Sequence, residues 1–143
     1  MNRRKEREQI FILLFENTIN KDVMEEIIEN ACSYREFEIN DYIKDISKDI
    51  SNTYDHLDEM ISKYSRNWDK VRISKVALSL LRLSLYEILF IENIPIGVSI
   101  NEAVELAKKY GGEDDSAFIN GILGTISKDL EKNKNLLQNT SQE

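Results

Sequence analysis

Cysteine and histidine are nearly absent from this chain of 143 residues, which contains one of each, Cys32 and His56. A single cysteine cannot form an internal disulfide, and one cysteine with one histidine cannot build a zinc site. We therefore expect neither a disulfide framework nor a bound metal, and we expect no cofactor. A reducing cytoplasm is the compartment that fits this composition.

Proline and glycine are also scarce: the chain has one proline and five glycines, while 41% of its residues are hydrophobic. Many short strands would need more turn-forming residues than this. The chain is long enough to bury a substantial core without a second domain. We therefore predict an all-α fold over residues 1–132, in which an N-terminal bundle of about residues 1–65 packs beside a C-terminal bundle of about residues 66–132.

No apolar run is long enough for an export signal or a membrane span. Residues 10–15 form a run of six apolar residues that ends at Glu16. Residues 73–91 are richer in apolar side chains, but Lys75, Arg82 and Glu87 interrupt them, and each such charge is unfavourable at bilayer depth. We therefore expect this segment to be a central helix that is buried on several sides, and we expect no membrane partner.

Basic residues are outnumbered by acidic ones, 19 against 26, which gives a net charge of −7. This charge disfavours broad binding to nucleic acid, so we expect no DNA partner, and any RNA contact must be local. Enzyme signatures are lacking as well: no histidine, cysteine or serine lies beside Glu102 at a triad spacing, and Gly111-Gly112 is not followed by Lys-Ser or Lys-Thr. We therefore expect an adapter and not an enzyme.

Apolar residues in the first half recur in steps of three or four, which is the spacing of amphipathic helices. The first helix is predicted to end near Asn20. Asp22 and Glu25 have the spacing of a capping box that opens the second helix. A third pattern runs over residues 43–64, as one long helix or as two joined near residues 51–52. The apolar stripe predicted for the second helix consists of Val23, Ile27, Ala31 and Tyr34.

The central helix of the second half is followed by residues that end one helix and begin the next. Pro95 is expected to stop it, because a proline disfavours helical geometry in the residue before it. Ser99 and Glu102 have the S-x-x-E spacing of a second capping box, so the next helix is predicted to restart there.

The last helix is predicted to begin near residues 114–115. A glycine inside a helix costs about 1 kcal/mol relative to alanine, so we expect Gly121 to lie at a close helix crossing, which Asn120 would bridge. Residues 133–143 are polar and are expected to form a disordered tail.

Two further residues are interpreted as structural. Trp68 is expected to fill the junction between the two bundles. Arg82 lies inside the central apolar helix, where an unpaired charge would be strongly destabilising. We therefore expect Arg82 to pair with Glu87, with Glu102 or with a backbone carbonyl.

Several short motifs follow one another in a fixed order. They are Trp68 with Arg72-Ile73, Leu81-Arg82 with Tyr86-Glu87, Ile94-Pro95, Asn101-Glu102-Ala103 with Glu105-Leu106-Ala107-Lys108, and Phe118-Ile119-Asn120-Gly121-Ile122-Leu123. In this order they resemble the NusB family of bacterial transcription antitermination factors, a domain also seen at the N-terminus of some ribosomal RNA methyltransferases. The resemblance covers nearly the whole chain and implies two small helical bundles side by side.

The resemblance also implies a function in binding and not in catalysis. It implies pairing with NusE, which is also the tenth protein of the small ribosomal subunit. The pair would bind the boxA element of nascent RNA, so that RNA polymerase reads through terminators, notably in ribosomal RNA operons.

Cations crowd the first turns of the first predicted helix, and Arg3 and Arg7 continue the line of its apolar stripe. Taken alone, this is an ordinary solvated terminus in which Glu6 and Glu8 balance the charge. The resemblance favours RNA binding instead. The residues that it assigns to RNA phosphates are Arg3, Arg4, Lys5 and Arg7.

Four other positions take their roles from the resemblance. Asp114 and Phe118 match the RNA-binding surface of the family, although Asp114 would serve equally as a helix N-cap. Phe15 stands where many relatives carry tyrosine, and Ala77 stands where relatives often carry an acidic residue. These last two are expected near the NusE interface.

Two alternatives remain beside the RNA-binding adapter. The first is a protein-only helical scaffold or homodimer, in which the N-terminal arginines have no RNA to bind. The second is an enzyme domain of the methyltransferase kind, which is disfavoured because we expect no cofactor-binding domain after residue 143. The sequence leaves open whether the free protein is a monomer or a dimer.

Overall fold

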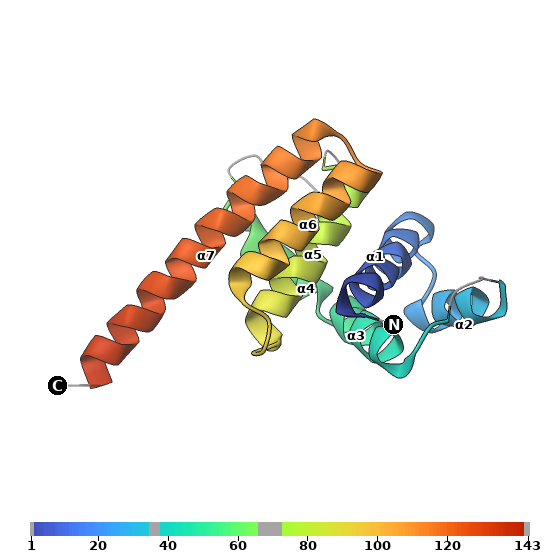
Figure 1. The fold of residues 1–143 in the computed structure, drawn as a ribbon, viewed down its shortest axis with the longest axis horizontal. Helices are drawn as coiled ribbons and strands as arrows, with labels where there is room; N and C mark the ends of the chain where they lie inside the picture. Colours follow the sequence, from blue (N-terminus) through green and yellow to red (C-terminus); the bar gives the residue numbers. More distant parts are fainter. Residues whose placement is uncertain (1, 35–37, 66–72, 142–143) are drawn as a thin grey trace.

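The structure, a computed structural model, describes residues 2–34, 38–65 and 73–141, with side chains as far as residue 133. This described part contains seven helices and no strand (Figure 1), so the predicted all-α fold is confirmed. Trp68 lies in the segment 66–72, outside the described residues. The helices are α1 (Arg3–Asn20), α2 (Met24–Tyr34), α3 (Asp41–Asn52), α4 (Tyr54–Ser62), α5 (Lys75–Phe90), α6 (Ile96–Tyr110) and α7 (Glu113–Ser141).

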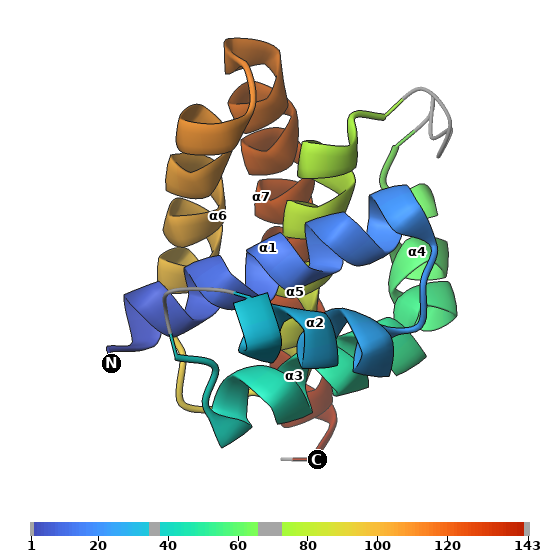
Figure 2. The same cartoon turned by 90° about the vertical axis from the view of Figure 1, so that its right-hand side faces the viewer.

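The helices form two groups, and α5 packs against helices of both. One group consists of α5, α6 and α7, and the other consists of α1, α2 and α3, with α4 packed beside α5 (Figures 1 and 2). α1 crosses α5 on the side away from α7 (Figure 2). Every residue from 77 to 87 is therefore buried, as predicted for a central helix covered on several sides.

Polar caps begin three of the helices. The side chains of Asn2, Asn40 and Ser74 each accept a hydrogen bond from the backbone N–H three residues later, at 2.9 to 3.0 Å. Each bond satisfies a donor that the first helical turn leaves free. The long pattern over residues 43–64 is two helices separated at Thr53, which agrees with one of the two predicted arrangements.

The second helix differs from its predicted start. α2 begins at Met24, and the carbonyl of Val23 accepts the first helical N–H bonds, from Glu26 at 3.1 Å and Ile27 at 3.2 Å. Asp22 therefore precedes the cap position, and the predicted capping box is wrong. Two members of the predicted stripe, Val23 and Tyr34, are exposed at 58% and 86%. The buried stripe is Met24, Ile27, Ile28 and Ala31.

The capping box predicted at Ser99 and Glu102 is also wrong. α6 begins at Ile96, directly after Pro95, so both residues lie inside the helix. Pro95 is the N-cap residue of this helix, with φ −59° and ψ 140°. α5 has already ended at Phe90, and residues 91–94 separate it from Pro95. Ser99 is buried against α5, where its carbonyl accepts a hydrogen bond from Ser84 Oγ at 3.1 Å.

Close packing is found at Gly111, in the turn before α7, and not at Gly121. An added Cβ on Gly121 would meet no atom within 4 Å, so the predicted close crossing is wrong. At Gly111 a Cβ would overlap the Asp115 carboxylate and lie 3.1 Å from the Ala107 carbonyl oxygen and 3.2 Å from Val76 Cγ1. A side chain at position 111 would therefore displace these neighbours, so the turn between α6 and α7 favours glycine there.

The last helix is longer than predicted. α7 continues to Ser141, whereas the sequence led us to expect a disordered tail from residue 133. Residues 131–138 contain no glycine or proline, and lysine, leucine, glutamate and glutamine are good helix formers. This intrinsic preference is consistent with a helix that continues after its apolar stripe has ended.

Candidate nucleic-acid interface

The predicted RNA-binding cations lie in the first two turns of α1, but they differ in exposure. The side chains of Arg3 and Arg4 are 51% and 76% exposed, and Lys5 is exposed as well. Arg7 is buried, with 5% of its side chain exposed. Arg3, Arg4 and Lys5 are therefore accessible to a phosphate, and Arg7 is not.

Arg7 forms a buried ion pair with Glu87 of α5. Its Nε lies 2.8 Å from Glu87 Oε2 and 3.1 Å from Oε1. Burial raises the pKa of Glu87 above its ordinary value, and the charge of Arg7 offsets part of that effect. The expectation that Arg7 binds RNA is therefore corrected: its guanidinium ties α1 to α5.

Arg82 pairs with a residue that the sequence analysis did not consider. Its Nε lies 2.9 Å from Asp58 Oδ1 and its Nη2 lies 2.7 Å from Oδ2, while its Cζ stacks 3.8 Å from the centre of the Tyr54 ring. Burial raises the pKa of Tyr54 to about 12, so the ring beneath the cation stays neutral. A buried pair is present as expected, but its partner belongs to α4 and is neither Glu87 nor Glu102.

Arg4 reaches across to α6. Its Nε and Nη2 both donate to Glu102 Oε1, at 3.2 and 2.9 Å, and this bond raises the pKa of Arg4. Glu102 is therefore an anchor for Arg4 and not a helix cap. Lys109 Nζ lies 2.8 Å from Glu8 Oε2 and joins the same two helices. The Nη1 of Arg4 makes no bond with the described residues, so this edge of the guanidinium remains available.

Arg3 faces α3, within its own group of helices. Its Cζ lies 3.6 Å from the centre of the Tyr42 ring, at the start of α3, and its Nη1 lies 3.3 Å from Glu6 Oε1. Tyr42 was missed by the sequence analysis, which grouped it with no site. The side chain of Lys5 makes no ion pair among the described residues. The three accessible cations, Arg3, Arg4 and Lys5, thus sit where α1 lies between α3 and α6. We call them the α1 cluster.

A groove at the other end of the C-terminal bundle, which we call the α7 groove, brings three predicted residues together. It has a volume of about 900 Å³ and lies between the end of α4, the start of α5 and the start of α7. Asp114, Phe118 and Ala77 all line it, together with Tyr64, Ser65, Ile73, Ser74, Asp115, Ala117, Gly121 and Ile122. The RNA-binding and partner-binding positions that the resemblance implied on α7 and α5 are therefore neighbours.

The charge of this groove differs from that of the α1 cluster. Asp115, and not Asp114, closes the start of α7, because its Oδ2 accepts the Gly112 N–H at 3.2 Å. Its Oδ1 accepts a hydrogen bond from the Ser74 hydroxyl at 2.9 Å, which ties α7 to α5. Asp114 is exposed and accepts no hydrogen bond from a backbone N–H of the described residues, so the alternative N-cap role is wrong. The carboxylates on this wall repel phosphate and attract donor groups.

Phe15 and Ala77 offer little free surface. Ala77 is 1% exposed, so a partner would reach it only through the groove. Phe15 is half-buried, and its ring centre lies 5.9 Å from that of Phe11, which in turn lies 5.1 Å from Tyr110. Both residues therefore belong partly to the core.

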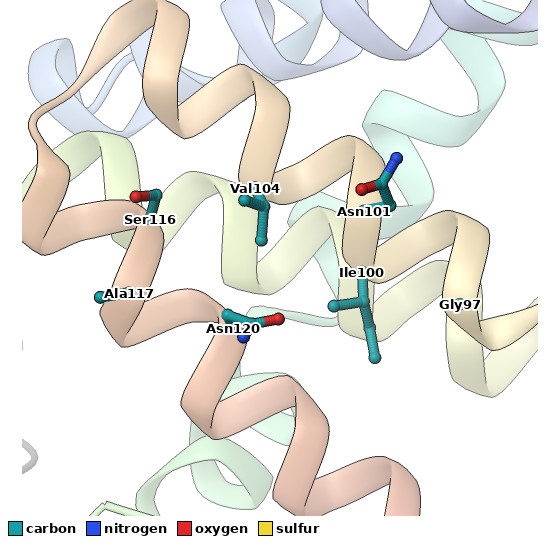
Figure 3. Close-up of a pocket in the computed structure, with 7 residues that line it drawn as sticks. All are labelled: Gly97, Ile100, Asn101, Val104, Ser116, Ala117 and Asn120. Atoms are coloured by element: carbon teal, nitrogen blue, oxygen red, sulfur yellow. The ribbon is translucent and has the colours of Figure 1, made fainter.

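A second groove, of about 460 Å³, lies between α6 and α7 (Figure 3). Asn120 stands on its rim and points from α7 toward Ile100 of α6, so it faces the neighbouring helix but does not bridge a close crossing. Asn101 lies on the opposite wall. Neither asparagine was assigned to this groove from the sequence.

The described part of the chain holds no group of three or more histidine, cysteine, aspartate or glutamate side chains suited to a metal ion. None of its helices is long and apolar enough to cross a membrane.

Comparison with known proteins agrees with the order of the sequence motifs. Residues 4–128 match the NusB family. Transcription antitermination protein NusB of Clostridium botulinum (strain Kyoto / Type A2) is 46% identical over 142 residues, which cover 88% of this chain and 99% of that protein.

Among solved structures, T. maritima NusB superposes with a TM-score of 0.77 and 33% identity, covering 90% of this chain and 92% of the other. A chain in the crystal structure of a plectonemic RNA supercoil superposes with a TM-score of 0.82 and 25% identity, covering 91% and 97%. The chain therefore belongs to the NusB family.

Proposed function

We propose that this protein is an RNA-binding transcription antitermination factor that pairs with NusE on boxA RNA and promotes read-through by RNA polymerase, notably in ribosomal RNA operons. The observation that carries the proposal is the 46% identity, over 88% of the chain, to a protein named Transcription antitermination protein NusB. One structural relative lies in a crystal structure of an RNA supercoil. The protein acts in the cytoplasm as a binding protein, without catalysis or a cofactor.

The phosphate-binding part of the interface is the α1 cluster, which consists of Arg3, Arg4 and Lys5. All three side chains reach solvent. In a protein with a net charge of −7, phosphate binding requires such a local concentration of cations. Arg7 contributes only by holding the start of α1 against α5.

The α7 groove has the chemistry of a base-binding surface. Phe118 is half-buried and offers an aromatic wall, while the exposed carboxylate of Asp114 accepts hydrogen bonds. Sequence-specific recognition of single-stranded RNA uses aromatic faces and the edges of unpaired bases. Asp114 is therefore suited to a base amine, and phosphate contacts are left to the α1 cluster.

NusE is proposed to bind beside the α7 groove, near Phe15 and Ala77. Because Ala77 is buried and Phe15 is half-buried, these residues shape the surface more than they supply contacts. The complex with RNA would then dock on RNA polymerase.

The test is fluorescence anisotropy of a labelled boxA RNA, titrated with this protein alone and with NusE, at two salt concentrations. Tighter and salt-sensitive binding in the presence of NusE is the expected result. Absence of RNA binding in both titrations would contradict the proposal.

A pair of double variants sharpens this test. Arg4→Ala/Lys5→Ala removes two accessible cations, and the slope of log affinity against log salt should become less steep by about 1.4, or about 0.7 for each phosphate contact on a single strand. Lys128→Ala/Lys132→Ala also removes two exposed cations, but from α7. This control should leave the slope unchanged.

A protein-only scaffold or homodimer is the second candidate, and one observation favours it. Arg3 and Arg4 each already contact a carboxylate, those of Glu6 and Glu102, so part of their charge is neutralised within the chain. If this candidate is correct, both double variants will behave like the wild type toward RNA, and sedimentation will show self-association or a protein complex.

A further inference from the structure

The Arg3 guanidinium lies over an aromatic ring. Its Cζ lies 3.6 Å from the centre of the Tyr42 ring, a distance at which the planar cation stacks on the ring face. Tyr42 lies in the first turn of α3 and is half-buried, so the ring is itself supported. Partial burial raises the pKa of Tyr42, and the ring remains neutral under physiological conditions.

A second contact fixes the rotation of the same guanidinium. Arg3 Nη1 lies 3.3 Å from Glu6 Oε1. Glu6 is buried, and its other carboxylate oxygen accepts a hydrogen bond from Asn40 Nδ2 at 2.9 Å. Asn40 also caps α3 through its Oδ1, at 2.9 Å from the Ile43 N–H. The group that orients Arg3 is therefore anchored to the backbone of the helix that carries Tyr42.

Part of the Arg3 side chain remains open to solvent. Half of its side chain is exposed, although Tyr42 covers one face and Glu6 holds one edge. A planar cation that is fixed in this way has already lost the side-chain freedom that stacking would cost. Arg4 and Lys5, which follow it directly, would hold the adjacent phosphates.

We propose that Arg3, supported by Tyr42, is a stacking platform for one unpaired base of the bound RNA. Unpaired RNA bases stack on guanidinium planes as well as on aromatic side chains. The base would lie on the open face of Arg3, so that Tyr42, guanidinium and base form three layers. This inference rests on the proposed function, and it adds a base contact to a region that otherwise supplies only charge.

Arg3→Lys separates a platform from a simple phosphate contact, because it keeps the charge and removes the plane. Loss of one stacked base weakens single-strand binding on the order of 10-fold. We expect Arg3→Lys to bind boxA RNA about 10-fold more weakly than the wild type, with the same salt dependence. We expect Tyr42→Leu to show a similar loss, whereas Tyr42→Phe, which keeps the ring, should bind like the wild type.

A series of RNAs with one abasic nucleotide at successive positions then locates the base. When the abasic nucleotide replaces the stacked base, the wild type should bind that RNA about 10-fold more weakly than the intact RNA. On that RNA, Arg3→Lys should bind no more weakly than the wild type. Arg4→Lys is the matched comparison, because Arg4 contacts a carboxylate and no aromatic ring among the described residues. Whatever affinity Arg4→Lys loses should not depend on any single base.

Two results would overturn the inference. The first is equal binding by the wild type and Arg3→Lys. The second is a loss for Arg3→Lys that persists undiminished on every abasic RNA. Circular dichroism and thermal unfolding establish whether each variant is folded. If Tyr42→Leu does not fold, the comparison of Arg3→Lys with the wild type still tests the inference. If the wild type binds no RNA, the proposed function fails first, which is a distinguishable outcome.

Discussion

Arg7→Met tests whether the first helix is held to α5 by a buried ion pair. The substitution keeps much of the apolar stem but leaves the carboxylate of Glu87, which is 2% exposed, without its cation. Removing one partner of a buried pair costs about 3–5 kcal/mol, against a total stability of about 5–15 kcal/mol for a typical domain. At about 2–4 °C per kcal/mol for a chain of this size, Tm should fall by roughly 10 °C.

The double variant Arg7→Met/Glu87→Met is the control. It replaces both charges by apolar groups, so no buried charge is left unpaired, and its free energy of unfolding should lie within about 1 kcal/mol of the wild type. Urea denaturation followed by circular dichroism measures both variants. A loss below about 1 kcal/mol for Arg7→Met, which is the size expected of an exposed pair, would refute the reasoning. A double variant no more stable than the single one would refute it as well.

The same double variant also bears on the RNA interface. Because Arg7 is buried and lies outside the proposed interface, Arg7→Met/Glu87→Met should bind boxA RNA with the affinity and salt dependence of the wild type. Weaker binding by a variant that unfolds normally would return Arg7 to the interface, where the family resemblance had placed it.

Four further predictions concern other parts of the molecule. Gly111→Ala should destabilise the protein by about 1–3 kcal/mol in urea denaturation, since the added Cβ meets the Ala107 carbonyl and Val76. Gly121→Ala should instead stabilise it by about 1 kcal/mol, because nothing lies near the new methyl group and alanine favours helix; a loss would restore the predicted close crossing. Lys21 ends α1 with φ 59°, so Lys21→Gly should raise stability by about 1 kcal/mol in the same assay. Finally, burial raises the folded-state pKa of Glu87 above its ordinary value of 4.5. In the pH range between 4.5 and this raised pKa, the folded chain therefore binds more protons than the unfolded chain. The stability contributed by Glu87 should therefore fall as pH rises through this window, and a Glu87→Gln variant measured over the same pH range should lack that component.

Local spacing in the sequence was enough to predict most of the helices. Apolar periodicity identified the central helix and the end of α1 near Asn20, because these features depend on neighbours three or four positions away. It left open whether residues 43–64 form one helix or two, and the structure has two. Capping was less predictable. Asp22 and Ser99 stand at plausible spacings, yet the chain begins α2 and α6 elsewhere, at positions that packing and Pro95 select.

The partners of the charged residues could not be predicted in the same way. Arg82 was expected to pair with Glu87, with Glu102 or with a backbone carbonyl, but Asp58 approaches it from α4, 24 positions earlier. Similarly, Glu102 has the spacing of a cap but serves Arg4, which lies 98 positions away. Such pairs are set by how two helices cross, and periodicity within each helix carries no information about that crossing.

The depth of each cation along α1 accounts for its role. A helix rises about 1.5 Å per residue, so Arg7 lies about 6 Å further along the axis than Arg3. That single turn carries the side chain from the rim of the molecule, where Arg3 is half-exposed, to the interior beside Glu87. A sequence pattern that places both residues on one face therefore cannot separate a cation that holds the bundles together from one that faces solvent. Whether a cation on this face is buried depends on how α5 and α6 pack against α1, which is a property of the assembled fold.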